Sequence, residues 1–217
     1  VRSRRGVNRA QAAELLPVAR AVAARFRQHA AVLAALAEAE HDAGNDDEAI
    51  VAADAALAID PGQVNAYVQK GYALFRKAEK ATDAKVFREA RAPFIALNKI
   101  ENDHPLPLLY NYLAQRQIGP PTEMSISALE RAVELAPFDM GLRFMLVMQQ
   151  IRDKRYDAAA NTVTPLAYNP HGGAGTARMR KLLDRLKARE GLDPLALDAL
   201  MKDENDATGG TEQGGDE

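Results

Sequence analysis

The sequence has no cysteine and no tryptophan, and it has few aromatic residues of any kind. Without cysteine, the chain can form neither a disulfide framework nor a thiolate zinc site. Aromatic residues make up only 6% of the 217 residues, whereas alanine is abundant. Because alanine is the best helix former and long β-branched runs are absent, the composition favours helix over sheet.

The chain also lacks a charge imbalance and a long apolar run. Its formal net charge is −2, with 28 basic and 30 acidic residues, so the charge gives no general reason to expect nucleic acid as a partner. No apolar run reaches the roughly 18 residues that a membrane span needs, and no secretory signal is visible. We expect a soluble chain, in the cytoplasm or the periplasm. Because it begins at Val1 rather than Met, we also expect it to be part of a longer protein.

Motifs of the common enzyme classes are missing as well. The sequence contains no GxSxG elbow, no phosphate-binding GxxxxGK loop and no zincin-type pair of histidines. Two Glu-x-x-His spacings, Glu38–His41 and Glu101–His104, are of the kind that builds di-iron sites in four-helix bundles. The second spacing lies against Pro105 at a predicted helix end, and the predicted helices are too short for such a bundle. We therefore expect no metal, no cofactor and no enzyme activity in this part of the protein.

The most informative stretch is residues 30–63, which predict two short helices and a clear end to the second one. Apolar and small residues recur with a helical period on both sides of a turn at Gly44. Asp46 and Asp47 follow the turn, and their side-chain oxygens could cap the second helix. Pro61 ends that helix, because proline disfavours helical geometry in the residue before it.

This unit of about 34 residues resembles the tetratricopeptide repeat, a pair of antiparallel helices with small residues where the helices cross. The family's small-residue positions and its terminal proline are held here by Ala37, Ala49, Ala56 and Pro61, and Ala53 stands at the aromatic position of the second helix. Gly71 takes the position of Ala37 in the next repeat. The aromatic residue of the second helix and the tryptophan of the first are missing, with Leu33 in place of the latter.

Prolines divide the rest of the chain into similar segments. The predicted stops are Pro61, Pro105, Pro137 and Pro170, and the interval between the first two is stretched. The extra residues lie around residues 78–85 and in a lengthened second helix of the second repeat.

We predict four regions from this pattern. Residues 1–29 form a basic start and a leading helix, which would be half of a preceding repeat, and residues 30–170 form the repeat array. Residues 171–201 form a loop and terminal capping helices, with a basic amphipathic helix over residues 175–190. Residues 202–217 are acidic and glycine-rich, and they lack the apolar side chains needed to fold.

The resemblance implies an all-α fold, a right-handed superhelix of antiparallel helix pairs with about four repeats plus terminal helices. It also implies a concave wall, built mostly from first helices, that binds peptide or protein segments. The positions of this chain that match the family's groove are Glu38, His41, Asn65, Tyr72, Arg76, Asn111, Gln115, Met148 and Arg152. Some family members clamp a carboxylate there, but Glu38 would repel one, so we do not expect that mode here.

Two functions stay open from the sequence. The first is a non-catalytic scaffold whose groove receives a protein or peptide of unknown identity. The second is an accessory helical-repeat region of a longer chain that carries a catalytic, peptidase-like domain upstream. The basic terminal helix, with Arg180 and Lys181, is a rival binding surface. The sequence does not predict an oligomeric state.

Overall fold

The computed structural model describes residues 9–81, 83–171 and 173–202, and every regular element within these ranges is a helix. The prediction of an all-α chain is therefore confirmed. Most of the predicted basic start and the predicted acidic tail lie outside the described residues. No helix in the described ranges is both long and apolar enough to cross a membrane.

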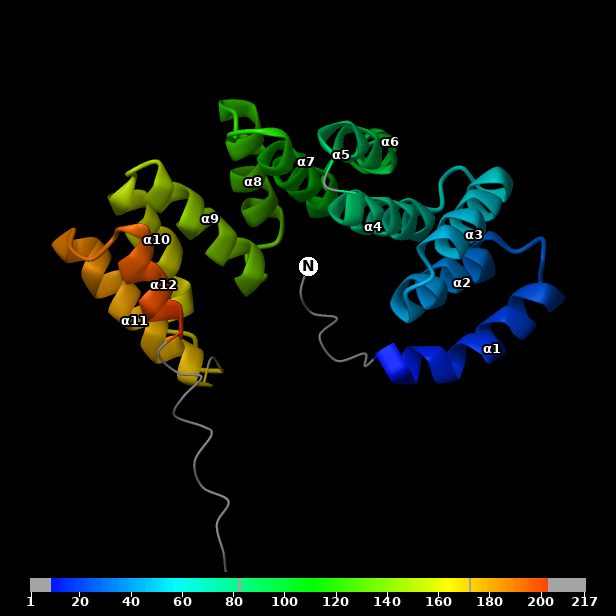
Figure 1. Ribbon diagram of the computed structural model, residues 1–217, viewed down its shortest axis with the longest axis horizontal. Helices are drawn as coiled ribbons and strands as arrows, with labels where there is room; N and C mark the ends of the chain where they lie inside the picture. The colour runs from blue at the N-terminus through cyan, green and yellow to red at the C-terminus, as the bar shows by residue number, and fades with distance from the viewer. Residues whose placement is uncertain (1–8, 82, 172, 203–217) are drawn as a thin grey trace, which may run out of the picture. The chain divides into compact units, whose positions relative to one another are not determined.

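The chain divides into two compact units, residues 1–136 and residues 137–217. The first unit contains the helices labelled α1 to α8 in Figure 1: α1 (Arg9–Arg25), α2 (Ala30–Ala43), α3 (Asp46–Ile59), α4 (Val64–Ala81), α5 (Ala84–Ala90), α6 (Ala92–Ile100), α7 (Pro105–Ile118) and α8 (Glu123–Leu135). The second unit contains α9 (Met140–Arg152), α10 (Tyr156–Ala167), α11 (Gly173–Ala188) and α12 (Pro194–Lys202).

Alanine makes the close crossing of α2 and α3 possible. Ala37 of α2 and Ala49, Ala53 and Ala56 of α3 are completely buried, and most of them belong to one alanine-rich core cluster. A methyl group fills little space, so the two helix backbones can approach closely. Gly44 ends α2 in the left-handed conformation, with φ of 96°, which glycine adopts without steric cost. The predicted turn and the predicted small-residue face are thus confirmed.

Gly71 has the same role where α4 meets α6. A Cβ atom added to Gly71 would lie 2.4 Å from Cζ of Phe94, so no larger residue fits while that ring stays in place. The Phe94 ring is buried and stacks on Tyr110 of α7, with ring centroids 4.2 Å apart. The lack of a side chain at Gly71 therefore leaves room for the Phe94 ring, which joins α4, α6 and α7.

The stretched second repeat differs from the prediction. Instead of one lengthened second helix, the chain forms two short ones, α5 and α6, which are separated at Arg91. Asp83 caps α5 by accepting a hydrogen bond from the backbone N–H of Lys85 at 2.8 Å. Pro93 lies in the first turn of α6. Backbone N–H groups in the first turn have no intrahelical acceptor, so the lack of an N–H in proline costs no hydrogen bond there. The proline explains why a new helix begins there.

The predicted cap of α3 is wrong. The helix begins at Asp46 itself, and its N-cap Asn45 makes no side-chain capping bond. The Asp46 carboxylate is instead buried and receives hydrogen bonds from α4. At α8, Thr122 and Ser125 form a reciprocal capping box.

The second unit packs its four helices around one apolar cluster. Val147 of α9, Val163 of α10 and Leu182 of α11 are completely buried in it. Leu182, Leu183 and Leu186 all face this core, as the amphipathic pattern of the basic terminal helix predicts. Leu197 and Leu200 of α12 complete the cluster.

Candidate functional site

Aromatic rings from three successive first helices meet on one face of the first unit. His41 of α2 lies 5.8 Å from Tyr72 of α4, and Tyr72 lies 5.5 Å from Tyr110 of α7, measured between ring centroids. These rings surround a depression of about 270 Å³, which we call the aromatic hollow. Its lining is His41, Asp42, Tyr72, Phe75, Arg76, Glu79 and Tyr110. Three predicted groove residues, His41, Tyr72 and Arg76, are thus brought together.

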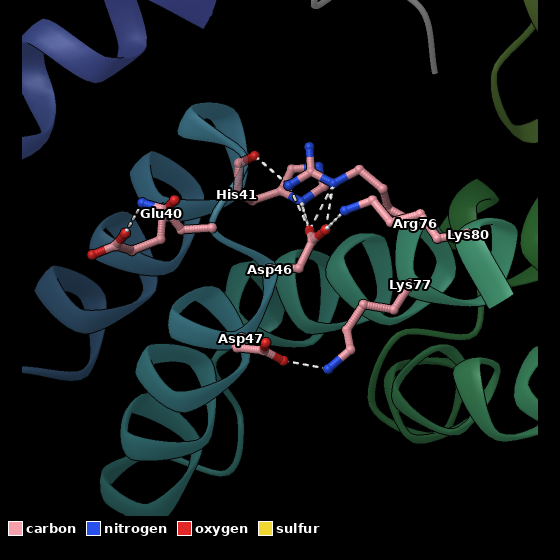
Figure 2. Close-up of polar contacts among 8 residues, drawn as sticks. Glu40, His41, Asp46, Asp47, Arg76, Lys77 and Lys80 are labelled. Atoms are coloured by element: carbon pink, nitrogen blue, oxygen red, sulfur yellow. Dashed lines mark hydrogen bonds and ion pairs between the residues drawn. The ribbon is translucent and has the colours of Figure 1, made fainter.

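The guanidinium of Arg76 is held in place by a buried carboxylate. Arg76 Nε donates to both oxygens of Asp46, at 2.7 and 2.8 Å, and its Nη2 donates to the His41 carbonyl at 2.6 Å. Lys80 donates to the same carboxylate at 3.1 Å. Figure 2 shows Asp46 enclosed by His41, Arg76 and Lys80, with the Asp47–Lys77 ion pair to one side. These contacts of Asp46, Arg76 and Lys80, with the bond to the His41 carbonyl, hold α2, α3 and α4 together beside the hollow.

Burial and charge set the protonation states in this group. Burial lowers the pKa of His41, and the positive charge of Arg76 lowers it further, against the opposing effect of Asp46. The imidazole is therefore neutral at pH 7, with Nδ1 3.4 Å from Asp46 Oδ1 but without hydrogen-bond geometry. Burial alone would raise the pKa of Asp46, but the hydrogen bonds and charges of Arg76 and Lys80 outweigh it and hold that pKa below its usual value.

The charged residues around the hollow favour the binding of a cationic group. Asp42 and Glu79 belong to the lining and are both acidic, whereas the one basic lining residue, Arg76, is paired with Asp46. The faces of tyrosine rings also attract cations. A hollow with aromatic walls and two acidic residues can therefore receive the side chain of an arginine or a lysine.

The other predicted residues of the first unit lie outside this lining. Asn65 Nδ2 donates to Glu38 at 3.2 Å, so these two side chains link α2 to α4. Asn111 accepts a hydrogen bond from Arg91 at 3.2 Å. Gln115 donates to the carbonyl of Pro120 at 3.1 Å.

Met148 and Arg152, predicted for the fourth repeat, lie in the second unit. They line a separate cavity of about 800 Å³, which we call the apolar cleft. Its lining consists of Phe144, Met148, Ile151, Arg152, Lys154, Tyr156, Arg189, Leu192, Asp193, Pro194, Leu197, Asp198 and Met201. Of the predicted set, three residues therefore line the aromatic hollow and two line the apolar cleft, and the other four line neither.

Sequence reasoning missed several residues of the two sites. Asp46 was assigned to a helix cap, and Tyr110 was not among the predicted groove residues. Glu79 and Asp42 carried no motif. Only the helical spacing of Tyr72, Arg76 and Glu79 could have placed Glu79 on the groove side. No group of three or more His, Asp or Glu residues that could hold a metal ion occurs among the described residues, so neither Glu-x-x-His spacing belongs to one.

Two solved structures with a similar arrangement of helices give the fold a context. The first is YrrB, a TPR protein with an unusual peptide-binding site, with a TM-score of 0.59 and 17% sequence identity over 87% of this chain and 93% of that chain. The second is residues 41 to the end of MamA from Desulfovibrio magneticus RS-1, with a TM-score of 0.54 and 17% identity over 84% of this chain and 89% of that chain. No family model and no curated protein matches the sequence. The resemblance noted in the sequence is confirmed at the level of the fold: the chain has an all-α fold of the tetratricopeptide-repeat type.

Proposed function

We propose that this chain is a non-catalytic scaffold that binds a peptide segment of another protein on the α2–α4–α7 face of its first unit. The aromatic hollow carries this proposal, because its rings come from three successive first helices and its lining is partly exposed. One solved structure with this fold, YrrB, is described as having a peptide-binding site.

The chemistry of the hollow narrows the partner to a peptide that contains arginine or lysine. The basic side chain stacks against Tyr72 and Tyr110, and its charge faces Asp42 and Glu79. The Asp46–Arg76 pair keeps the hollow in shape without adding a net charge. Asn111 and Gln115 lie one helical turn apart on α7. The amide nitrogen of Asn111 and the amide oxygen of Gln115, which the bonds to Arg91 and Pro120 do not use, pair with the peptide backbone beyond the hollow.

A selection from random peptides displayed on phage tests the proposal with the full chain as bait. Selected peptides should be enriched in arginine or lysine, and Tyr72→Ala should weaken their binding by about tenfold or more, as is common for a central interface tyrosine. Tyr67→Ala is the matched control on the same helix, because Tyr67 contacts the Pro61 carbonyl and does not line the hollow.

The charge requirement is tested separately. Glu79→Gln should weaken binding and reduce its dependence on salt, whereas Glu89→Gln on the exposed surface of α5 should change neither. Peptides with no basic residue, or equal affinity in the Tyr72 and Tyr67 variants, would refute the proposal.

A further inference from the structure

Helix α1 of the first unit carries apolar side chains on two of its sides. The side that packs against α2 (Figure 1) contains buried residues, which are Ala12, Leu16 and Ala23. The residues on a second side are exposed, and we call them the α1 stripe, which consists of Leu15, Val18, Val22 and Phe26. Leu15 is 66% exposed and Val18 is 62% exposed, so the described part of the chain leaves the stripe largely uncovered.

The spacing of the α1 stripe is typical of a seam between two helices. Its members follow one another at intervals of three or four residues, so they lie along one side of the helix. Phe26 directly follows α1, and its backbone N–H donates to the Val22 carbonyl at 3.0 Å, so Phe26 continues the last turn. A second helix can therefore pack along the whole length of the stripe.

Two charged residues flank opposite ends of the stripe. Glu14 directly precedes Leu15, and Arg25 lies in the last turn of α1, with its guanidinium 5.6 Å from the centroid of the Phe26 ring. Neither Glu14 nor Arg25 forms an ion pair with another described residue, whereas Arg20 on a different side of α1 pairs with Glu40 at 2.7 Å. Glu14 and Arg25 are about three helical turns apart, so they lie on the same side of α1.

This pattern is complementary to itself in one orientation. When a second copy of α1 lies antiparallel to the first, Val18 of each copy faces Val22 of the other. Leu15 then faces Phe26, and Glu14 of each copy lies beside Arg25 of the other. In a parallel pair, each of these charged residues would lie beside its own equivalent, and like charges repel. The antiparallel contact is therefore favoured, and it is isologous, because the same surface supplies both of its sides.

We propose that two copies of this chain associate through the α1 stripe, with their α1 helices antiparallel about a twofold axis. Four apolar side chains from each copy cover less than the ~800 Å² per partner of a standard stable interface, so the dimer is weak, with a dissociation constant on the order of 10–100 µM. The lining of the aromatic hollow comes from α2, α4 and α7, so this proposal is independent of peptide binding there.

Sedimentation equilibrium of the full chain, from low micromolar to near-millimolar concentration, tests the proposal. The native chain should change from monomer to dimer over this range. Val18→Glu places a charge from each copy in the apolar seam and should weaken the association at least tenfold. Val51→Glu is the matched control, because Val51 is 70% exposed on α3 and should leave the association unchanged. Circular dichroism checks that each variant stays helical.

Mixtures of variants test the role of the charges and the orientation. Glu14→Arg and Arg25→Glu should each weaken self-association several-fold, but the two variants should bind each other more tightly than either binds itself. The chain has no cysteine, so Val18→Cys and Val22→Cys each introduce a single thiol. Under oxidation, a mixture of these two variants should form a disulfide between unlike chains faster than either variant forms one with itself.

Three results would overturn the proposal. A chain that stays monomeric at the highest concentration would show that the stripe does not bind a second copy, and would leave it as a docking face for a helix of another protein. A dimer that Val18→Glu leaves intact would place the contact elsewhere on the chain. Val18→Cys chains that cross-link to one another faster than to Val22→Cys chains would show that the helices are parallel.

Discussion

The replacement Gly71→Ala tests the crossing of α4 and α6 on which the first unit depends. The new Cβ atom would lie 2.4, 2.5 and 2.9 Å from three atoms of the Phe94 ring, far inside the usual carbon–carbon contact of about 3.5–4.0 Å. Phe94 is 1% exposed and stacks on Tyr110, with Tyr72 at 6.2 Å between ring centroids. The ring therefore cannot move without disturbing the aromatic hollow.

Two opposing effects determine how much Gly71→Ala changes the free energy of unfolding. Alanine is favoured over glycine in a helix by up to about 1 kcal/mol. Overpacking a well-packed core costs typically about 1–3 kcal/mol, and an overlap of this size places Gly71→Ala at the upper end of that range. We expect a net loss of about 2 kcal/mol in the free energy of unfolding.

Urea unfolding, together with hydrogen exchange in α4 and α6, measures this loss in the first unit. Gly175→Ala is the control, because an added Cβ on Gly175 of α11 meets no atom within 4 Å and should leave stability unchanged or raise it by up to about 1 kcal/mol. Phe94→Leu should reduce the effect of Gly71→Ala, since the two side chains are in contact and their effects are then not additive. A Gly71→Ala variant as stable as the native chain would refute this account of the crossing.

Other stability changes follow from the caps and the buried carboxylates. Thr122→Ala removes the oxygen that accepts from the Ser125 N–H at the start of α8 and should cost about 1 kcal/mol in urea unfolding. Asp46→Ala leaves Arg76 without its main partner and should cost about 2–3 kcal/mol, because hydrogen bonds to charged groups are strong and Asp46 is buried. Burial alone would raise the pKa of Glu40, but hydrogen bonds from Arg20 and Asn45 hold it below its usual value, as Arg76 and Lys80 do for Asp46. The contribution of both carboxylates to stability is therefore present at neutral pH and should be lost as the pH falls below about 4. Asp46→Asn should flatten this dependence in urea titrations at several pH values.

The fold was predictable because its signals are local. Alanine at Ala37, Ala49, Ala53 and Ala56 recurs with a helical period, and each helix pair ends at a proline. The break between α5 and α6 was missed, because Ala84–Ala90 reads equally well as the start of one long helix. Pro93, in the first turn of α6, is the signal in the sequence that could have placed the break.

The candidate site was predictable only in part, because its contacts join distant residues. Asp46 and Arg76 lie 30 positions apart, and nothing in the neighbourhood of Asp46 distinguishes a carboxylate that caps its own helix from one that bonds another helix. His41, Tyr72 and Arg76 were identified through the repeat register. Which predicted residues line the aromatic hollow, which line the apolar cleft and which line neither follows from three-dimensional packing, and the repeat pattern does not indicate it.

Hydrogen exchange of the full chain with and without a selected basic peptide tests the central claim most directly. Binding at the aromatic hollow predicts slower exchange in α2, α4 and α7, and little change in α11. Tyr72→Ala should abolish that protection at the same peptide concentration, whereas Tyr67→Ala should retain it. Protection confined to α11, with its basic residues Arg180 and Lys181, would contradict the account and move the binding site to the terminal helix.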